Sequence, residues 1–108
     1  MPTPTTDRYA ARARVLKAMA HPVRLCLLDA LAKDERCVAD LQALVGLDMS
    51  TVSKHLAVLR GAGLLDADKR GNQVFHRLRT PCVLGFFGCI ESVLAAGAAR
   101  ALDVLEPR

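Results

Sequence analysis

Four cysteines carry the most reactive side chains of this chain: Cys26, Cys37, Cys82 and Cys89. No secretory signal precedes them, because the Pro/Thr-rich start is not followed by an apolar run of signal length. We therefore expect a cytoplasmic protein whose thiols stay reduced. Reduced cysteines in that compartment favour metal, metalloid or redox chemistry over structural disulfides.

The spacing of the cysteines limits the site they can form. Cys82 and Cys89 fall on one face of a predicted helix, separated by roughly 10 Å of rise. Thiolates that share one ion at about 2.3 Å must lie within about 5 Å of each other. A compact site therefore needs a distorted helix start, ligands from two protomers, or Cys37, which precedes a helix whose N-terminus favours thiolate. Packing is the alternative role for these three, and Cys26, beside core leucines, is predicted to be structural.

A second set of polar side chains lies on a predicted helix–turn–helix. Its second helix begins near Ser50, a plausible N-cap, and carries Val52, Leu56 and Leu59 on its inner face. The outer face is short and polar, which lets a helix enter a major groove and donate to bases or phosphates. The predicted DNA contacts are Ser50, Thr51, Ser53, Lys54 and His55 on this helix, and Lys69, Arg70 and Asn72 at the tip of a hairpin. An inert helix face and a solubilising hairpin tip are the alternatives.

Hydrophobic periodicity and turn residues predict the elements that position these side chains. Residues 1–6 are expected to be a disordered arm. One domain follows over residues 7–106, mainly α with a β-hairpin. Helices are predicted over residues 7–20, 22–32, 38–45, 50–60 and 81–105, and strands over 64–68 and 73–78. The segments at 33–36 and 46–49 are predicted to be connections.

Positive charge is concentrated in the helix–turn–helix and the hairpin. The chain has 15 Lys and Arg against 11 Asp and Glu, a net charge of +4. Residues 50–80 hold six basic and two acidic residues, so this segment alone carries +4, and the flanking parts cancel. Such asymmetry indicates a polyanion-binding surface, with double-stranded DNA as the first candidate. A solvated face is the alternative.

Length and composition exclude several classes of protein. A chain of 108 residues with 52% apolar content is one small ordered domain, too small for an elaborate active site, and we expect no enzyme. The apolar stretch 82–99 is interrupted by Glu91-Ser92 and three glycines, so we expect no membrane span. A stripe on the last helix is too apolar to face water, which predicts a homodimer through the first and last helices. The stripe consists of Cys82, Phe86, Cys89, Val93 and Ala96.

Several runs of residues follow one another with a characteristic spacing: AHPVRL at 20–25, STVSKHL at 50–56, LRGAGL at 59–64 and KRGNQVF at 69–75. These runs resemble the ArsR/SmtB family of metalloregulatory repressors, over about residues 8–100. The resemblance implies a winged-helix homodimer that binds operator DNA and leaves it when an inducer binds. Twofold symmetry would place two recognition helices about 34 Å apart on an inverted repeat.

The resemblance also bears on the inducer. The family's metal box reads Cys-Val-Cys-Asp-Leu, and here Cys37 matches its first cysteine whereas Ala39 replaces the second. The family's zinc site on the last helix uses His and carboxylate, but the histidines of this chain lie in other elements. The ligands that remain for an inducer are therefore thiolates, which prefer soft metal ions and metalloids. We expect arsenite or antimonite as inducer, then cadmium or lead, bound by Cys37, Cys82 and Cys89, with no organic cofactor.

Other functions remain open from the sequence. A thiol redox or persulfide-responsive repressor of the same fold is the main alternative. A thiol enzyme is disfavoured because no polar cluster or phosphate loop accompanies the cysteines. A dimeric adaptor that does not bind DNA is the last alternative.

Overall fold

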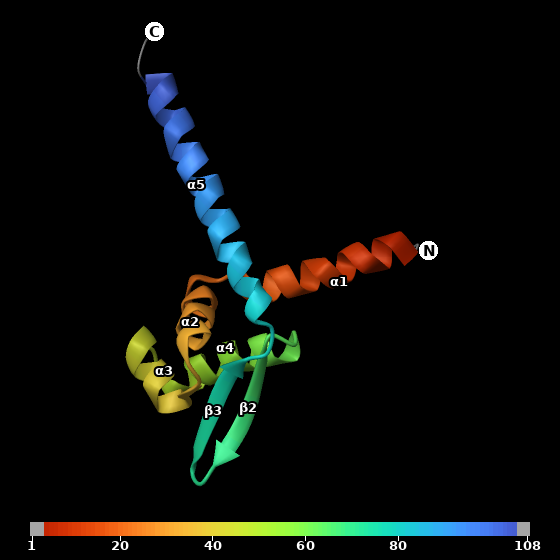
Figure 1. Ribbon diagram of the computed structural model, residues 1–108. Helices are drawn as coiled ribbons and strands as arrows, with labels where there is room; N and C mark the ends of the chain where they lie inside the picture. Colours follow the sequence, from red (N-terminus) through yellow and green to blue (C-terminus); the bar gives the residue numbers. More distant parts are fainter. Residues whose placement is uncertain (1–3, 106–108) are drawn as a thin grey trace.

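The computed structural model describes residues 4–105, arranged as Figure 1 shows. In chain order the elements are α1 (Pro4–Met19), α2 (Pro22–Lys33), β1 (Arg36–Cys37), α3 (Val38–Val45), α4 (Met49–Gly61), β2 (Leu65–Arg70), β3 (Gln73–Leu78), the short 3-10 helix η1 (Pro81–Val83) and α5 (Leu84–Leu105). The strands form one antiparallel sheet in the order β1-β3-β2. Helices α3 and α4 are the helix–turn–helix, and α4 is its recognition helix. Strands β2 and β3 form the predicted hairpin, which is the wing of the fold.

The hydrophobic core lies between α2, α3, α4 and the base of the hairpin. Apolar residues spaced three and four apart place Val52, Leu56 and Leu59 on the inner face of α4, and all three are fully buried. They pack with buried leucines of α2 and α3. The opposite face of α4 is therefore held in position by an apolar ridge.

Two turns set the angles between these helices. His21 has an extended backbone and its Nδ1 accepts a hydrogen bond from the N–H of Val23 at 3.1 Å, which caps α2. Pro22 occupies the first turn of α2, where no N–H is required. Gly46 ends α3 at φ +72°, a left-handed conformation that glycine adopts without strain, and its N–H donates to the carbonyl of Gln42.

Helices α1 and α5 extend away from the core in different directions (Figure 1). Most of their described side chains are exposed, including large apolar ones. These are Tyr9, Val15 and Leu16 on α1, and Phe86, Ile90, Val93 and Leu94 on α5. The segment Pro81–Ala101 also has the length and mean hydropathy, 1.8, of a membrane-spanning helix, but one such helix is by itself a weak indication of a membrane protein.

Some element boundaries differ from the prediction. Helix α1 begins at Pro4, so residues 4–6 are helical rather than part of a disordered arm, and residues 1–3 lie outside the described residues. The segment 33–36 was predicted to be a polar connection, yet Arg36 and Cys37 pair with His76 and Phe75 of β3. Strand β2 continues to Arg70, which narrows the hairpin turn to residues 71–72.

Candidate nucleic-acid interface

The N-terminus of α4 is capped by Asp48, two residues before the predicted Ser50. Asp48 Oδ1 accepts a hydrogen bond from the N–H of Thr51 at 3.0 Å, and the hydroxyl of Ser50 donates to Oδ2 at 3.3 Å. These bonds, the one from Thr51 first, lower the pKa of Asp48 from its ordinary value. Asp48 rather than Ser50 is the N-cap because the backbone of Asp48 is extended, as an N-cap requires, whereas Ser50 already lies in the helix.

The polar residues of α4 differ in their exposure. Ser50, Ser53 and Lys54 are exposed, and Thr51 is half-buried. His55 is also half-buried and is turned toward the α1–α2 turn: its ring lies 4.4 Å from that of His21. Ser53 and Lys54 are therefore better placed than His55 to reach a DNA groove.

Arg24 from α2 also contacts this histidine pair, because its Nη1 donates to Nδ1 of His55 at 3.3 Å. Burial, followed by the neighbouring His21 and Arg24, lowers the pKa of His55. His55 therefore links the recognition helix to the start of α2 in addition to its predicted role at DNA.

At the tip of the hairpin, Lys69, Arg70 and Asn72 are all exposed, as a DNA-contacting wing requires. Gly71 makes the turn possible at φ +64°. Lys69 forms no ion pair with any side chain that the structure describes. Its charge is therefore available to a phosphate.

Arg70, in contrast, is occupied by protein carboxylates. Its guanidinium donates to both carboxylate oxygens of Glu35, at 2.6 and 3.0 Å, and to Asp68 at 3.0 Å, and it lies over the ring of Phe75. The hydrogen bond from Arg70 lowers the pKa of Glu35, and the two carboxylates raise that of Arg70. Arg77 is likewise paired, with Asp66 at 3.7 Å.

A buried histidine joins the wing to the recognition helix. His76 of β3 is 1% exposed, and its Nε2 accepts a hydrogen bond from Nη1 of Arg60 at 2.8 Å. Burial first, and the charge of Arg60 second, lower the pKa of His76. The sequence-based set of DNA contacts did not include this pair. The inward position of His76 in the alternating strand β3 is the signal that could have found it.

Cys37 lies beneath this surface. It is 6% exposed and lines a cavity of about 310 Å³ together with two predicted DNA contacts, Ser53 of α4 and Asn72 of the hairpin. The structure therefore brings one predicted sensing residue next to the predicted DNA interface. Cys82 and Cys89 are exposed, in η1 and α5 respectively.

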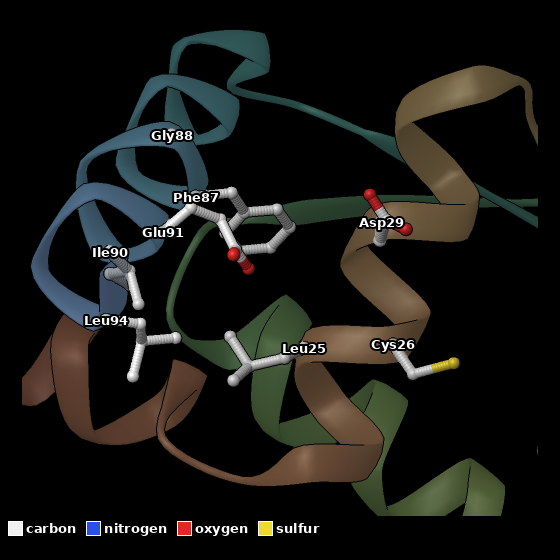
Figure 2. Close-up of a pocket in the computed structure, with 8 residues that line it drawn as sticks. All are labelled: Leu25, Cys26, Asp29, Phe87, Gly88, Ile90, Glu91 and Leu94. Atoms are coloured by element: carbon white, nitrogen blue, oxygen red, sulfur yellow. The ribbon is translucent and has the colours of Figure 1, made fainter. Parts of the chain in front are cut away.

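Cys26, predicted to be structural because it lies beside core leucines, is exposed. The inner face of α2 is occupied by Leu27, Leu28 and Leu31, so Cys26 falls on the outer face. It borders a groove of about 640 Å³ between α2 and α5, lined also by Leu25, Phe87 and Leu94. Figure 2 shows the sulfur of Cys26 pointing away from the α5 side chains, whereas Leu25 points toward them.

Comparison with known proteins identifies the family. A family model described as "Bacterial regulatory protein, arsR family" matches residues 21–67. The HTH-type transcriptional regulator Rv0081 of Mycobacterium tuberculosis is 33% identical over 99 residues, which cover 91% of this chain and 87% of that protein. This chain belongs to the ArsR family.

Solved structures confirm the winged helix–turn–helix fold of this ArsR-family chain. The crystal structure of Rv0081 matches it with a TM-score of 0.78 and 31% identity, over 93% of this chain and 98% of that one. The homodimeric winged helix–turn–helix domain Mb0332 of Mycobacterium bovis, solved by NMR, matches with a TM-score of 0.77 and 28% identity, over 93% of both chains.

The relatives also confirm that the ArsR-family chain is a transcriptional regulator and not an enzyme. One of them is the biofilm growth-associated repressor of Agrobacterium fabrum. It is 38% identical over 79 residues, which cover 72% of this chain and 68% of that protein.

The metal site implied by the ArsR/SmtB resemblance does not fit a single protomer. Among the residues whose side chains are described, no group of three or more His, Cys, Asp or Glu is arranged to hold a metal ion. The three predicted ligands differ in position: Cys37 is buried under the wing, and Cys82 and Cys89 are exposed on the segment that leads into and forms α5. An ion bound by these thiols would need ligands from more than one protomer or a rearranged chain.

Proposed function

We propose that this ArsR-family chain is a homodimeric transcriptional repressor of the cytoplasm that binds an inverted-repeat operator in double-stranded DNA. The observation that carries the proposal is the polar face of α4, where Ser53 and Lys54 are exposed above a fully buried ridge. Lys69 and Asn72 extend the same surface along the wing. Such a helix can read the major groove while the wing contacts phosphates.

A second copy of the chain is the proposed partner of α1 and α5. Both helices carry exposed apolar side chains that a single protomer leaves in water. The homodimeric state of the Mycobacterium bovis relative supports a homodimer. Pairing through these helices would cover the apolar faces and present two copies of α4 to the two halves of an operator. We propose that the apolar faces of α1 and α5 contact the second copy and not a membrane.

Titration of the purified protein into labelled promoter DNA from upstream of its gene tests the proposed function. We expect saturable binding that weakens steeply with salt and is stronger than binding to an unrelated duplex. The double variant Ser53→Ala/Lys54→Ala should lose most of this affinity. The control variant Asp29→Ala, in the groove between α2 and α5 and outside the polar face of α4, should keep it. Absence of any salt-dependent DNA binding would overturn the proposal.

We further propose that a thiophilic metal or metalloid is the inducer, with arsenite or antimonite as first choice. The support is the chemistry of the candidate ligands, which are three free thiols. Cys37 belongs to the DNA-binding part of the protomer, and Cys89 belongs to the proposed dimer helix. Ligands drawn from both parts would couple the inducer to the separation of the recognition helices.

Release of labelled promoter DNA by arsenite, compared with release by cadmium, zinc and peroxide, tests the inducer. A typical coupling free energy of about 1–3 kcal/mol corresponds to a 5- to 150-fold loss of operator affinity. Cys37→Ser, Cys82→Ser and Cys89→Ser should each reduce this loss, and Cys26→Ser serves as the matched control. Release by peroxide alone, with crosslinks that involve Cys37, would favour the redox alternative, and equal induction in all four variants would contradict the proposed site.

A further inference from the structure

We propose that Arg60 contacts an operator phosphate and that His76 of the wing is the residue that positions it. Neither residue belongs to the predicted set of DNA contacts. The inference rests on the proposed operator binding and adds a specific phosphate-binding side chain to it. Its basis is a hydrogen bond, a contrast in charge pairing and a position in the fold.

The hydrogen bond between the two residues has a defined direction. A guanidinium can only donate, so Nε2 of His76 must accept from Nη1 of Arg60, at 2.8 Å. A neutral imidazole with an accepting Nε2 carries its proton on Nδ1. The bond therefore requires His76 to be neutral, which its burial favours.

Burial of the polar His76 side chain destabilises the fold unless the bond to Arg60 compensates for it. The side chain is 1% exposed, and its Nδ1 is buried with no hydrogen-bond partner in the described part of the chain. An unpaired buried donor destabilises a fold, so a residue that served packing alone would be apolar. The bond to Arg60 is the contact that distinguishes histidine from leucine at this position.

Charge pairing distinguishes Arg60 from Arg70 and Arg77, the two arginines of the hairpin strands. Arg70 and Arg77 face protein carboxylates, which offset their charges. Arg60 forms no ion pair with any described side chain, and its hydrogen-bond partner His76 is neutral. Its side chain is exposed, and most of its five N–H donors remain free. Arg60 therefore presents a full positive charge held at a fixed place.

That place lies between the recognition helix and the wing. Arg60, His76 and Ser53 line one cavity of about 340 Å³. Ser53 and Arg60 are on the same face of α4, seven residues and roughly 10 Å apart. A helix in the major groove and a wing beside it straddle the phosphate strand between them. A phosphate of that strand would therefore lie within reach of the guanidinium of Arg60.

Operator affinity measured across a salt series tests the contact. Arg60→Gln should weaken binding by about tenfold, the size of a hydrogen bond to a charged group. It should also reduce the slope of log affinity against log salt by about 1 for each protomer bound. The same slope change is expected on an unrelated duplex, because phosphates carry no sequence. Arg77→Gln is the matched control. Arg77 follows His76 on β3 but is paired with Asp66, so its replacement should change the slope less.

A double-mutant cycle tests the positioning role. His76→Leu should weaken DNA binding like Arg60→Gln, His76→Gln should restore most of it by supplying an acceptor, and Arg60→Gln/His76→Leu should bind no more weakly than Arg60→Gln alone. Equal effects of His76→Leu with and without Arg60 would overturn the positioning role.

The outcomes separate this inference from the proposed function. If the wild-type protein binds promoter DNA and Arg60→Gln leaves the salt slope unchanged, or changes it no more than Arg77→Gln does, the inference fails and the proposed function stands. If the wild-type protein does not bind DNA, the proposed function fails first. Arg60 is exposed, so its replacement should leave the fold intact even if His76→Leu does not fold.

Discussion

Arg70 and Glu35 are 35 positions apart in the sequence, yet they form a two-point ion pair with N–O distances of 2.6 and 3.0 Å. The pair connects the wing tip to the segment that precedes β1. The side chain of Arg70 is 45% exposed and that of Glu35 is 34% exposed, so solvent screens the pair and it contributes little to stability. Its larger effect is on charge, because Glu35 offsets a cation that the hairpin would otherwise present to DNA.

Replacement of this carboxylate tests that effect. We expect Glu35→Gln to tighten DNA binding by about two- to fivefold and to leave the melting temperature nearly unchanged. Asp29→Asn removes the same charge from the groove beside α5 and is the control, with no comparable gain. Fluorescence anisotropy at low and physiological salt measures both. Weaker binding by Glu35→Gln would instead mean that the ion pair orients the wing.

The cap of the recognition helix gives a second prediction. Asp48→Ala removes the acceptor for the N–H of Thr51 and should lower the melting temperature by about 5 °C. Ser50→Ala removes only a hydroxyl that donates to Asp48 and should have a much smaller effect. Thermal unfolding followed by circular dichroism, at one protein concentration, compares the two. A larger loss in Ser50→Ala would contradict the assignment of Asp48 as the cap.

Acid should destabilise the fold through its buried histidine. The pKa of His76 in the folded protein lies below its ordinary value of 6.5, so below that pH the unfolded chain binds more protons than the folded one. Stability should therefore fall as pH drops below about 6.5, until it reaches the folded-state pKa of His76. Glu35 and Asp48, whose pKa values are also lowered, contribute only at more acidic pH.

His76→Gln isolates this contribution. Between about pH 7.5 and about pH 5.5, the melting temperature of the variant should fall less than that of the wild-type protein. Some decline should remain, because the pKa of His55 is lowered as well. Identical declines in variant and wild-type protein would show that His76 does not titrate in this range.

The exposed face of α5 gives a prediction about assembly. Val93 is 70% exposed in one protomer, and in a dimer through this stripe it would be buried. Val93→Glu should weaken dimerisation by at least about tenfold, because a charge would be desolvated without a partner. Ala95→Glu is the control, since Ala95 shares the side of Glu91. Sedimentation velocity over a concentration series distinguishes them, and equal dissociation of both variants would place the interface elsewhere.

Local signals predicted much of the fold. Helix α3 and strand β3 have the predicted limits, because their hydrophobic periods are clear and glycine or turn residues bound them. Strand β1 was missed because two residues carry no period, and its pairing with β3 depends on a contact 40 residues away in the chain, between Arg36 and His76. Asp48 and Ser50 both suit an N-cap, and only the backbone conformation chooses between them.

In the candidate site, too, local features could be predicted from the sequence and long-range contacts could not. The exposed positions of Ser53, Lys54 and Lys69 follow from the faces of local elements. The partners of Arg70, Arg60 and His55 depend on how distant elements pack, so sequence reasoning could not assign them. Cys26 is predicted to be structural because leucines surround it in sequence, but the rotation of α2 directs Leu27 and Leu28 inward and the thiol outward.

Strand β1 has a thermodynamic consequence for operator binding. A two-stranded hairpin is at best marginally stable in water, whereas a third strand gives the sheet independent stability. The pairs Arg36–His76 and Cys37–Phe75 therefore order the middle of the wing before any DNA arrives. The wing therefore loses this conformational entropy when the protein folds and not when it binds DNA. Wing contacts with phosphates then add to affinity without that entropic cost, and only the tip beyond β1 has conformational freedom left to lose on binding.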